Sequence, residues 1–474
     1  MTASVRALAA AIVVVLVGGV LAAAARGIDP ADDFPDRWDP RLQPLVDFVE
    51  AARGLRFEHP VEVQFLSPDA YLEATSADSD AVEDPTALAE ELEGEVARLR
   101  ALGVVSGRLD LGGILEQTIG ASTLGFYSSA DETIRVRGSE LTVGVRVTLV
   151  HELTHVLQDQ RFDLDDLLYD EDIDAGAYEA RLGLVEGDAV RTEDLYVAEV
   201  LDDRERQAYA EEVQADRDRS DAGNAGVPAF IRASFAAPYE LGTTFATMLA
   251  NAGGNREVDR AFRDPPATEE ALFDPASFLA DEVAGDVVTG LDDDAIDQSG
   301  PFGPVQWYLV LADRIDPSTA LEAALGWDGD EFAVEDRDGT TCVRVVFRGD
   351  TEEDEAQMAE AIDQWRAAFA EGRAKRVEVE GRPGIDACDP GPAADLQVAD
   401  RSLDTLVLPF LWGVFVAGQA HAGPDVARCV ARMALDGIDY SRLVDPDPSV
   451  AESVDADLRR RDLAATSACG SGDR

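Results

Sequence analysis

A histidine and glutamate pattern inside one predicted helix constrains this chain more than any other feature. Residues 150–157 read Val-His-Glu-Leu-Thr-His-Val-Leu, which places His151 and His155 four positions apart. Side chains at this spacing lie on one helical face, so both imidazoles can reach a single metal ion. Glu152 projects beside them, where a carboxylate can accept a proton from a metal-activated water. Only two further histidines occur in the chain, His59 and His421.

The residues around the pattern are those of a buried helix. No charged residue or proline falls within residues 148–158 except Glu152. The apolar stripe consists of Val150, Leu153, Val156 and Leu157. A helix with one apolar face is packed against a core on that face, which holds its ligand-bearing side rigidly.

A third protein ligand must come from elsewhere, because a two-histidine metal site normally has three protein ligands and an open position. No third histidine follows within reach, since the next one is His421. The next predicted helix, residues 174–201, offers Glu179, Glu186 and Glu193 on roughly one face. Glu186 lies in the most apolar stretch, where a carboxylate is costly to bury unless it is paired or metal-bound. We expect Glu186 as the third ligand, with Glu179 and Glu193 solvated or behind the ligands.

Two segments together resemble a known family. They are Thr-Leu-Val-His-Glu-Leu-Thr-His-Val-Leu-Gln-Asp-Gln at residues 148–160 and Leu-Val-Glu-Gly-Asp-Ala at residues 184–189. This combination resembles the zincin metallopeptidases of the gluzincin type. The resemblance implies Zn²⁺ held by His151, His155 and Glu186, with Glu152 as the general base. It further implies that the predicted strand at residues 133–137 is an edge strand that receives an extended peptide.

One position departs from the pattern of gluzincins similar to thermolysin. Those enzymes carry an aspartate four residues after the ligand glutamate, which orients a histidine, whereas this chain has Val190. The group behind the ligands must therefore differ, and Asp188 and Asp163 are the candidates. The residue that stabilises an oxyanion is left open among Tyr178, Tyr239 and His421.

The periodicity predicts an α+β fold that is mainly helical. Helices are expected at residues 85–102, 142–160, 174–201, 204–218, 239–252, 352–371 and 405–418, and strands at 61–65, 123–127, 133–137, 332–335, 340–347 and 376–380. We expect a zincin-like metallopeptidase domain with a small sheet at residues 27–295. A C-terminal α+β region is expected at residues 296–474, after a linker at 289–304.

The N-terminus and the cysteines indicate export. Residues 7–25 carry no charge and end in a small-residue pattern, so residues 1–26 are expected to be a signal peptide or an N-terminal membrane anchor. Both place the rest of the chain outside the cytoplasm. Four cysteines, all in the last third, predict two disulfides in an exported protein, with three possible pairings.

The charge balance excludes one class of partner. With 40 basic and 95 acidic residues the formal net charge is −55, so nucleic acid, whose phosphates need Lys or Arg, is not expected as a ligand. The excess fits a protein adapted to high salt, and it equally fits a GC-rich coding bias.

These features predict an exported, zinc-dependent metallopeptidase that hydrolyses peptide bonds of a peptide or protein substrate with a zinc-activated water. A rival hypothesis is a catalytically silent, zinc-containing cell-surface binding or envelope protein on the same scaffold. A third is a metal-independent acidic adhesion module. Contact with a membrane is expected only through the N-terminal segment, and the sequence leaves the substrate and the oligomeric state open.

Overall fold

The computed structural model describes most of the chain after its N-terminal segment. The described residues are 34–77, 85–114, 124–170, 173–224, 226–292, 295–369, 373–396, 398–399, 403–445 and 447–470. Helices predominate and two sheets are present, which confirms the predicted α+β, mainly helical class. The expected signal peptide or anchor at residues 1–26 lies outside the described residues. In the part that is described, no helix is long and apolar enough to span a bilayer.

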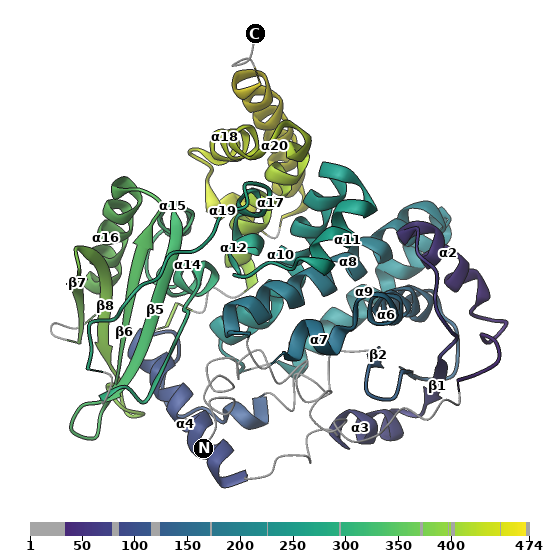
Figure 1. Ribbon diagram of the computed structural model, residues 1–474, viewed down its shortest axis with the longest axis horizontal. Helices are drawn as coiled ribbons and strands as arrows, with labels where there is room; N and C mark the ends of the chain where they lie inside the picture. The colour runs from purple at the N-terminus through teal and green to yellow at the C-terminus, as the bar shows by residue number, and fades with distance from the viewer. Residues whose placement is uncertain are drawn as a thin grey trace.

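A three-stranded sheet lies beside the histidine-bearing helix (Figure 1). Its order is β1–β3–β2, with β1 at Glu62–Leu66, β2 at Gly125–Ser128 and β3 at Thr133–Arg137. The β2–β3 hairpin is antiparallel and confirms the prediction, whereas β1 pairs with β3 in parallel. The expectation that β3 is an edge strand is wrong, because β1 occupies its other side. Among the described strands, β2 is the edge strand next to the helix.

Helix α6 (Val143–Phe162) carries the histidines, and its apolar stripe is buried as predicted. Thr142 caps its N-terminus by accepting a hydrogen bond from the backbone N–H of Val145 at 3.3 Å. The buried face packs against the three-stranded sheet and against α2 (Gln43–Arg53) in one hydrophobic cluster. The sheet and α2 therefore hold α6 from its apolar side and leave its histidine face toward α8 (Ala175–Glu199).

Glycines let α8 and α10 (Ala229–Gly253) cross at very short range. A Cβ atom on Gly187 would overlap the carbonyl of Gly242, and one on Gly242 would overlap the carbonyl of Gly183. The two backbones therefore touch, as they can only where side chains are missing. Helix α10 runs through the centre of the molecule, between the site-bearing helices and the rest of the chain (Figure 1).

The structure describes seven further helices between residues 34 and 300. They are α3 (Pro68–Ala77), α4 (Pro85–Leu102), α7 (Leu164–Tyr169), α9 (Asp203–Gly223), α11 (Asn255–Arg263), α12 (Glu270–Phe273) and α13 (Ala276–Leu279). Helix α10 begins ten residues earlier than the sequence predicts and contains Pro238 in its interior. Its long apolar face, packed on α8 and on the C-terminal helices, outweighs the hydrogen bond that the proline removes.

A five-stranded antiparallel sheet forms the opposite side of the molecule, in the order β4–β5–β6–β8–β7 (Figure 1). Its strands are β4 (Gln298–Gly300), β5 (Trp327–Asp336), β6 (Thr341–Gly349), β7 (Ala374–Val379) and β8 (Arg382–Cys388). Helices α4, α14 (Pro304–Ala312), α15 (Pro317–Ala324) and α16 (Glu352–Ala367) accompany it. The predicted hairpin of β5 and β6 is confirmed, and β4 pairs with β5 inside the segment expected to be a linker.

The last elements are a helical cluster. They comprise the 3₁₀ turns η3 (Leu403–Leu406) and η4 (Ala420–Ala422) and the helices α17 (Val407–Gly418), α18 (Pro424–Leu435), α19 (Tyr440–Leu443) and α20 (Pro448–Cys469). The uncharged segment predicted to be a buried helix is α17. Two disulfides form, as predicted. Cys342–Cys388 joins β6 to β8, and Cys429–Cys469 joins α18 to α20.

Residues on both sides of position 295 share one hydrophobic cluster, in which α10 packs against α17 and α14. Helix α4 likewise contacts β6 and β8 from the N-terminal side of the chain. The division into domains at 27–295 and 296–474 stays a prediction. What the fold establishes is that the two parts are joined by an extensive buried contact.

Candidate metal centre

Helices α6 and α8 bring the three predicted ligands together. Nε2 of His151 lies 3.3 Å from Oε2 of Glu186, and Nε2 of His155 lies 3.5 Å from the same oxygen. One ligand atom from each of the three residues lies within 4.8 Å of the others, so the group could hold a metal ion. The two rings are nearly perpendicular, with centroids 4.7 Å apart, and both present the same nitrogen to Glu186.

The electrostatics of this group favour a charged carboxylate. Burial opposes the charge of Glu186, but the nearby imidazoles of His155 and His151 outweigh it and lower the pKa of the carboxyl. Burial likewise opposes protonation of His151, yet its contacts with the carboxylates of Glu186 and Glu193, both at 3.3 Å, raise the pKa of the ring. The pKa of His155 is raised mainly by the charge of Glu186, again against the effect of burial. Ligand groups that attract positive charge in this way suit a cation.

Glu186 is also incompletely satisfied by the protein. Its Oε2 atom is buried and, among the described residues, meets no donor at hydrogen-bonding distance and angle. A buried carboxylate oxygen without a partner costs free energy, which makes this atom an exception that calls for an explanation. A metal ion bound between Glu186 and the two imidazoles would satisfy it, so the residues present fit such an ion.

Glu193 lies behind His151, on the side away from Glu186. Its Oε2 atom is 3.3 Å from Nδ1 of His151, and its Oε1 atom accepts a hydrogen bond from the Tyr209 hydroxyl at 2.9 Å. Glu193 therefore lies behind a predicted ligand, one of the two positions considered for it. Glu179 does not join the group. The pKa of its carboxyl is raised by burial and by the charge of Glu269, which lies on a different element.

Glu152 is held between α6 and the edge strand. Its Oε2 atom accepts a hydrogen bond from the backbone N–H of Tyr127 in β2 at 2.9 Å, and burial raises the pKa of the carboxyl. The strand approaches this closely because residue 125 is glycine. A Cβ there would lie 3.1 Å from Cγ2 of Thr148 and 3.2 Å from the carbonyl oxygen of Arg135. One carboxylate oxygen of Glu152 is thus fixed to the strand.

Of the three candidates for stabilising an oxyanion, Tyr239 lies against the ligands. Its hydroxyl lies close enough to Glu186 for the charge of that carboxylate to raise the pKa of the phenol. Tyr178 is buried, and the charges of both Tyr239 and Glu186 reach it. His421 is exposed in η4, and no contact of the described residues links it to the ligands.

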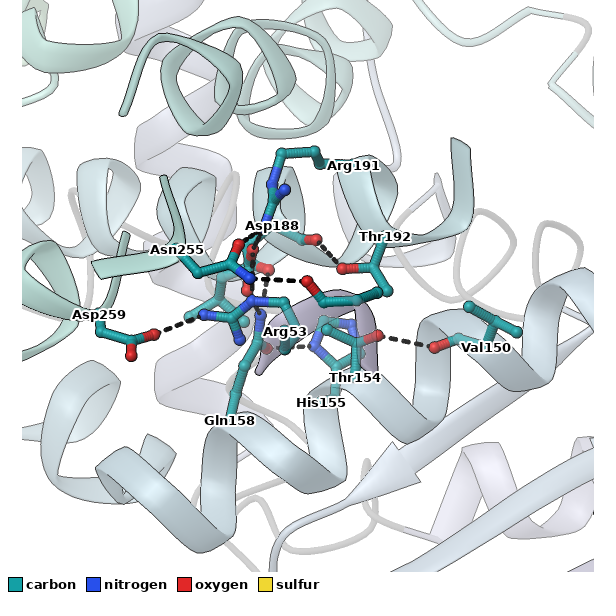
Figure 2. Close-up of polar contacts among 12 residues, drawn as sticks. Arg53, Val150, Thr154, His155, Gln158, Asp188, Arg191, Thr192, Asn255 and Asp259 are labelled. Atoms are coloured by element: carbon teal, nitrogen blue, oxygen red, sulfur yellow. Dashed lines mark hydrogen bonds and ion pairs between the residues drawn. The ribbon is translucent and has the colours of Figure 1, made fainter. Parts of the chain in front are cut away.

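Of the two aspartates expected behind the ligands, Asp188 belongs to the site and Asp163 does not. Asp163 caps α7 by accepting from the N–H of Asp166 at 3.1 Å. Asp188 contacts Gln158, which in turn contacts His155 (Figure 2). The sequence prediction missed Gln158, although it lies three residues after a ligand on the same helix, a spacing at which side chains meet. Arg53, which pairs with Asp188, carries no local signal at all.

Comparison with models of known protein families, with curated proteins and with solved structures found no match to this chain. The functional interpretation therefore stands on the geometry of the site itself.

Proposed function

We propose that this chain is an exported zinc metallopeptidase with a zincin-like catalytic arrangement. The observation that carries the proposal is the convergence of two imidazole nitrogens on one carboxylate oxygen, at 3.3 and 3.5 Å. Ligands of a tetrahedral zinc ion lie about 2.0–2.1 Å from the metal, which separates them from one another by roughly 3.4 Å. The separations of Glu186 from His151 and His155 are therefore those of a zinc ligand set.

Zn²⁺, when bound, supplies a Lewis acid that polarises a substrate carbonyl and makes water a competent nucleophile near neutral pH. Glu152 is the group that accepts the proton of the attacking water and passes it to the leaving amine nitrogen. The N–H of Tyr127 holds one of its oxygens, which leaves the other oxygen to accept this proton. The Tyr239 hydroxyl, beside Glu186, is a donor for the oxyanion that forms when the carbonyl is attacked.

Strand β2 is the surface that suits an extended peptide. It is the edge strand beside α6, and it already contacts Glu152 through Tyr127. A peptide added by backbone hydrogen bonds to the edge of β2 that no described strand occupies would pass next to the general base. This assigns to β2 the role that the sequence resemblance implied for β3.

The two disulfides suggest an extracellular location, in agreement with the expected export segment. A zinc peptidase in such a place would act on peptide or protein substrates outside the cytoplasm. The exclusion of nucleic acid follows from the charge of −55 and stays a prediction.

The proposal is tested by measuring bound zinc and peptide hydrolysis together in three variants of residues 27–474. Glu152→Gln should keep one zinc per chain and lose hydrolysis. His155→Ala should lose both. Glu179→Gln is the matched control, because it lies on the same helix as Glu186 but outside the ligand group, and it should keep both zinc and hydrolysis.

Full hydrolysis by Glu152→Gln would refute the mechanism. Bound zinc without hydrolysis of a broad peptide library would favour the rival, catalytically silent envelope protein.

A further inference from the structure

The imidazole of His155 is backed by the side-chain amide of Gln158 on the next turn of α6 (Figure 2). Nδ1 of His155 and Oε1 of Gln158 are 2.9 Å apart, and Gln158 is fully buried. A neutral imidazole has one nitrogen that donates and one that accepts, so the partner of Nδ1 determines which nitrogen is free for a metal.

The orientation of the Gln158 amide follows from its other contacts. Its Nε2 atom lies 3.0 Å from the carbonyl oxygen of Val185 and 3.0 Å from Oδ2 of Asp188. A carbonyl oxygen and a carboxylate oxygen accept hydrogen bonds, so the atom that faces them must be the NH₂ group. Oε1 then faces His155 and accepts, which requires the hydrogen of the ring on Nδ1. The lone pair of Nε2 is left pointing toward Glu186, 3.5 Å away.

Asp188 is itself fixed from behind by two arginines. Its Oδ1 atom lies 3.1 Å from Nε of Arg53 and 3.0 Å from the guanidinium of Arg191, and the side chains of Arg53 and Asp188 are fully buried. Arg53 pairs at the same time with Asp259 of α11 at 2.9 Å. The carboxylate therefore cannot turn away from Gln158 without giving up two buried contacts with arginines.

We propose that Gln158 is a positioning residue that selects the Nδ1–H tautomer of His155 and so presents Nε2 to the metal. Asp188 and Arg53 hold the amide in the required orientation. This chain of contacts connects a ligand on α6 to α2, about a hundred residues earlier in the sequence. The inference rests on the proposed zinc site.

Two substitutions of Gln158 separate this role from a structural one. Gln158→Met removes both the acceptor for His155 and the donors to Val185 and Asp188. Gln158→Glu keeps an acceptor oxygen for His155 but gives up the amide donors and places a second carboxylate against Asp188, so its folding should be weakened at least as much. If Gln158 acts on His155, both variants should lose thermal stability, but only Gln158→Met should change the histidine. Thr154→Val is the matched control, because Thr154 is fully buried on α6 and bonds only the carbonyl of Val150.

The first measurement is the tautomer of His155 by ¹⁵N NMR on histidine-labelled, metal-free protein, at a pH above the raised pKa of the ring. Four histidines in the chain keep the spectrum assignable. The wild type, Gln158→Glu and Thr154→Val should show the proton on Nδ1, whereas Gln158→Met should populate the Nε2–H form. The second is zinc affinity by competition with a chelating dye. Gln158→Met should bind zinc about 10- to 100-fold more weakly than the wild type, and the other two within a few fold.

An unchanged tautomer in Gln158→Met would overturn the inference. Equal losses of zinc affinity in Gln158→Met and Gln158→Glu would overturn it as well, because they would show a structural effect. The proposed zinc site fails separately, if the wild type binds no zinc. In that case the tautomer comparison still decides the role of Gln158, since it is made on the metal-free chain.

Discussion

Gly187 and Gly242 bring α8 and α10 into backbone contact beside the ligand Glu186. A Cβ on Gly187 would overlap the carbonyl of Gly242, so no side chain separates the two helices at this level. Tyr239 stands one turn before Gly242, and its hydroxyl reaches Glu186. The crossing therefore sets the distance between a predicted metal ligand and the tyrosine that accompanies it.

Gly187→Ala should push α8 and α10 apart and weaken both folding and zinc binding. The obstacle is backbone rather than a flexible side chain, so the overpacking should cost about 1–3 kcal/mol or more of unfolding free energy. Zinc affinity should fall with it, because Glu186 is the preceding residue. Urea unfolding and zinc competition measure the two effects.

Gly94→Ala is the control. Gly94 is exposed in the middle of α4 and has open space where the new Cβ would lie, so this substitution should stabilise the protein by about 0.5–1 kcal/mol. An unchanged zinc affinity in Gly187→Ala would contradict the role given to the crossing.

The sequence predicts those residues of the site whose spacing or surroundings along a helix indicate their role. His151 and His155 share a face because they are four residues apart, and Glu186 stood out because a carboxylate in an apolar helix needs a partner. Arg53 belongs to the site only through its contact with Asp188, about 135 residues away, and Tyr127 only through its contact with Glu152, 25 residues away. No local pattern marks either of them, so a single sequence cannot place them.

The same limit applies to the small sheet. The alternation of residues 133–137 predicts a strand, and the short turn before it predicts a hairpin. Which strand lies at the edge depends on whether β1, about seventy residues earlier, joins the outer side of β3. Strand pairing over that distance is determined by the packing of the whole cluster around Ile134 and Val136, which both have fully buried side chains. The hairpin of β2 and β3 is therefore predicted correctly, whereas the prediction that β3 is the edge strand is wrong.

Glu269 should make folding less favourable as the pH rises. Burial raises the pKa of its carboxyl to about 8, although it accepts a hydrogen bond from the N–H of Val305 at 2.9 Å. A carboxyl whose folded pKa lies above its unfolded value of 4.5 holds its proton longer in the folded state. The loss of unfolding free energy caused by Glu269 is absent below pH 4.5. Above pH 4.5 it grows by up to about 1.4 kcal/mol per pH unit, and it levels off above pH 8.

Glu269→Gln keeps the acceptor oxygen and removes this titration. Urea unfolding at pH 5 and pH 8 should show the wild type losing more stability than Glu269→Gln over this interval. Taking the difference between the two proteins cancels the contributions of other buried carboxyls, such as Glu270. If wild type and variant lose equal stability between the two pH values, Glu269 is not the group that titrates.

The disulfide Cys429–Cys469 should stabilise the fold without affecting the metal site. It closes a loop of 40 residues between α18 and α20, for which the chain-entropy estimate is about 4 kcal/mol. Replacing both cysteines by serine should lower the unfolding free energy by about 2–4 kcal/mol and leave zinc affinity unchanged. Thermal unfolding and dye competition on the same preparation give both values. A large loss of zinc binding would mean that the C-terminal helices support the site directly.

Arg53→Met should be among the most destabilising substitutions in the chain. The guanidinium is fully buried and pairs with both Asp188 and Asp259, so its removal takes one cationic partner from each of two carboxylates. Breaking a buried pair of this kind typically costs about 3–5 kcal/mol, most of it from the uncompensated charge.

The nearby Arg56 provides the matched control, because its ion pair with Glu50 leaves 82% of the arginine side chain exposed. Arg56→Met should change the unfolding free energy by less than about 1 kcal/mol. The unfolding free energy in urea and the zinc affinity should both fall in Arg53→Met and neither in Arg56→Met. Equal unfolding free energies of the two variants would show that Arg53 of α2 does not fix the positions of Asp188 and Gln158 behind His155.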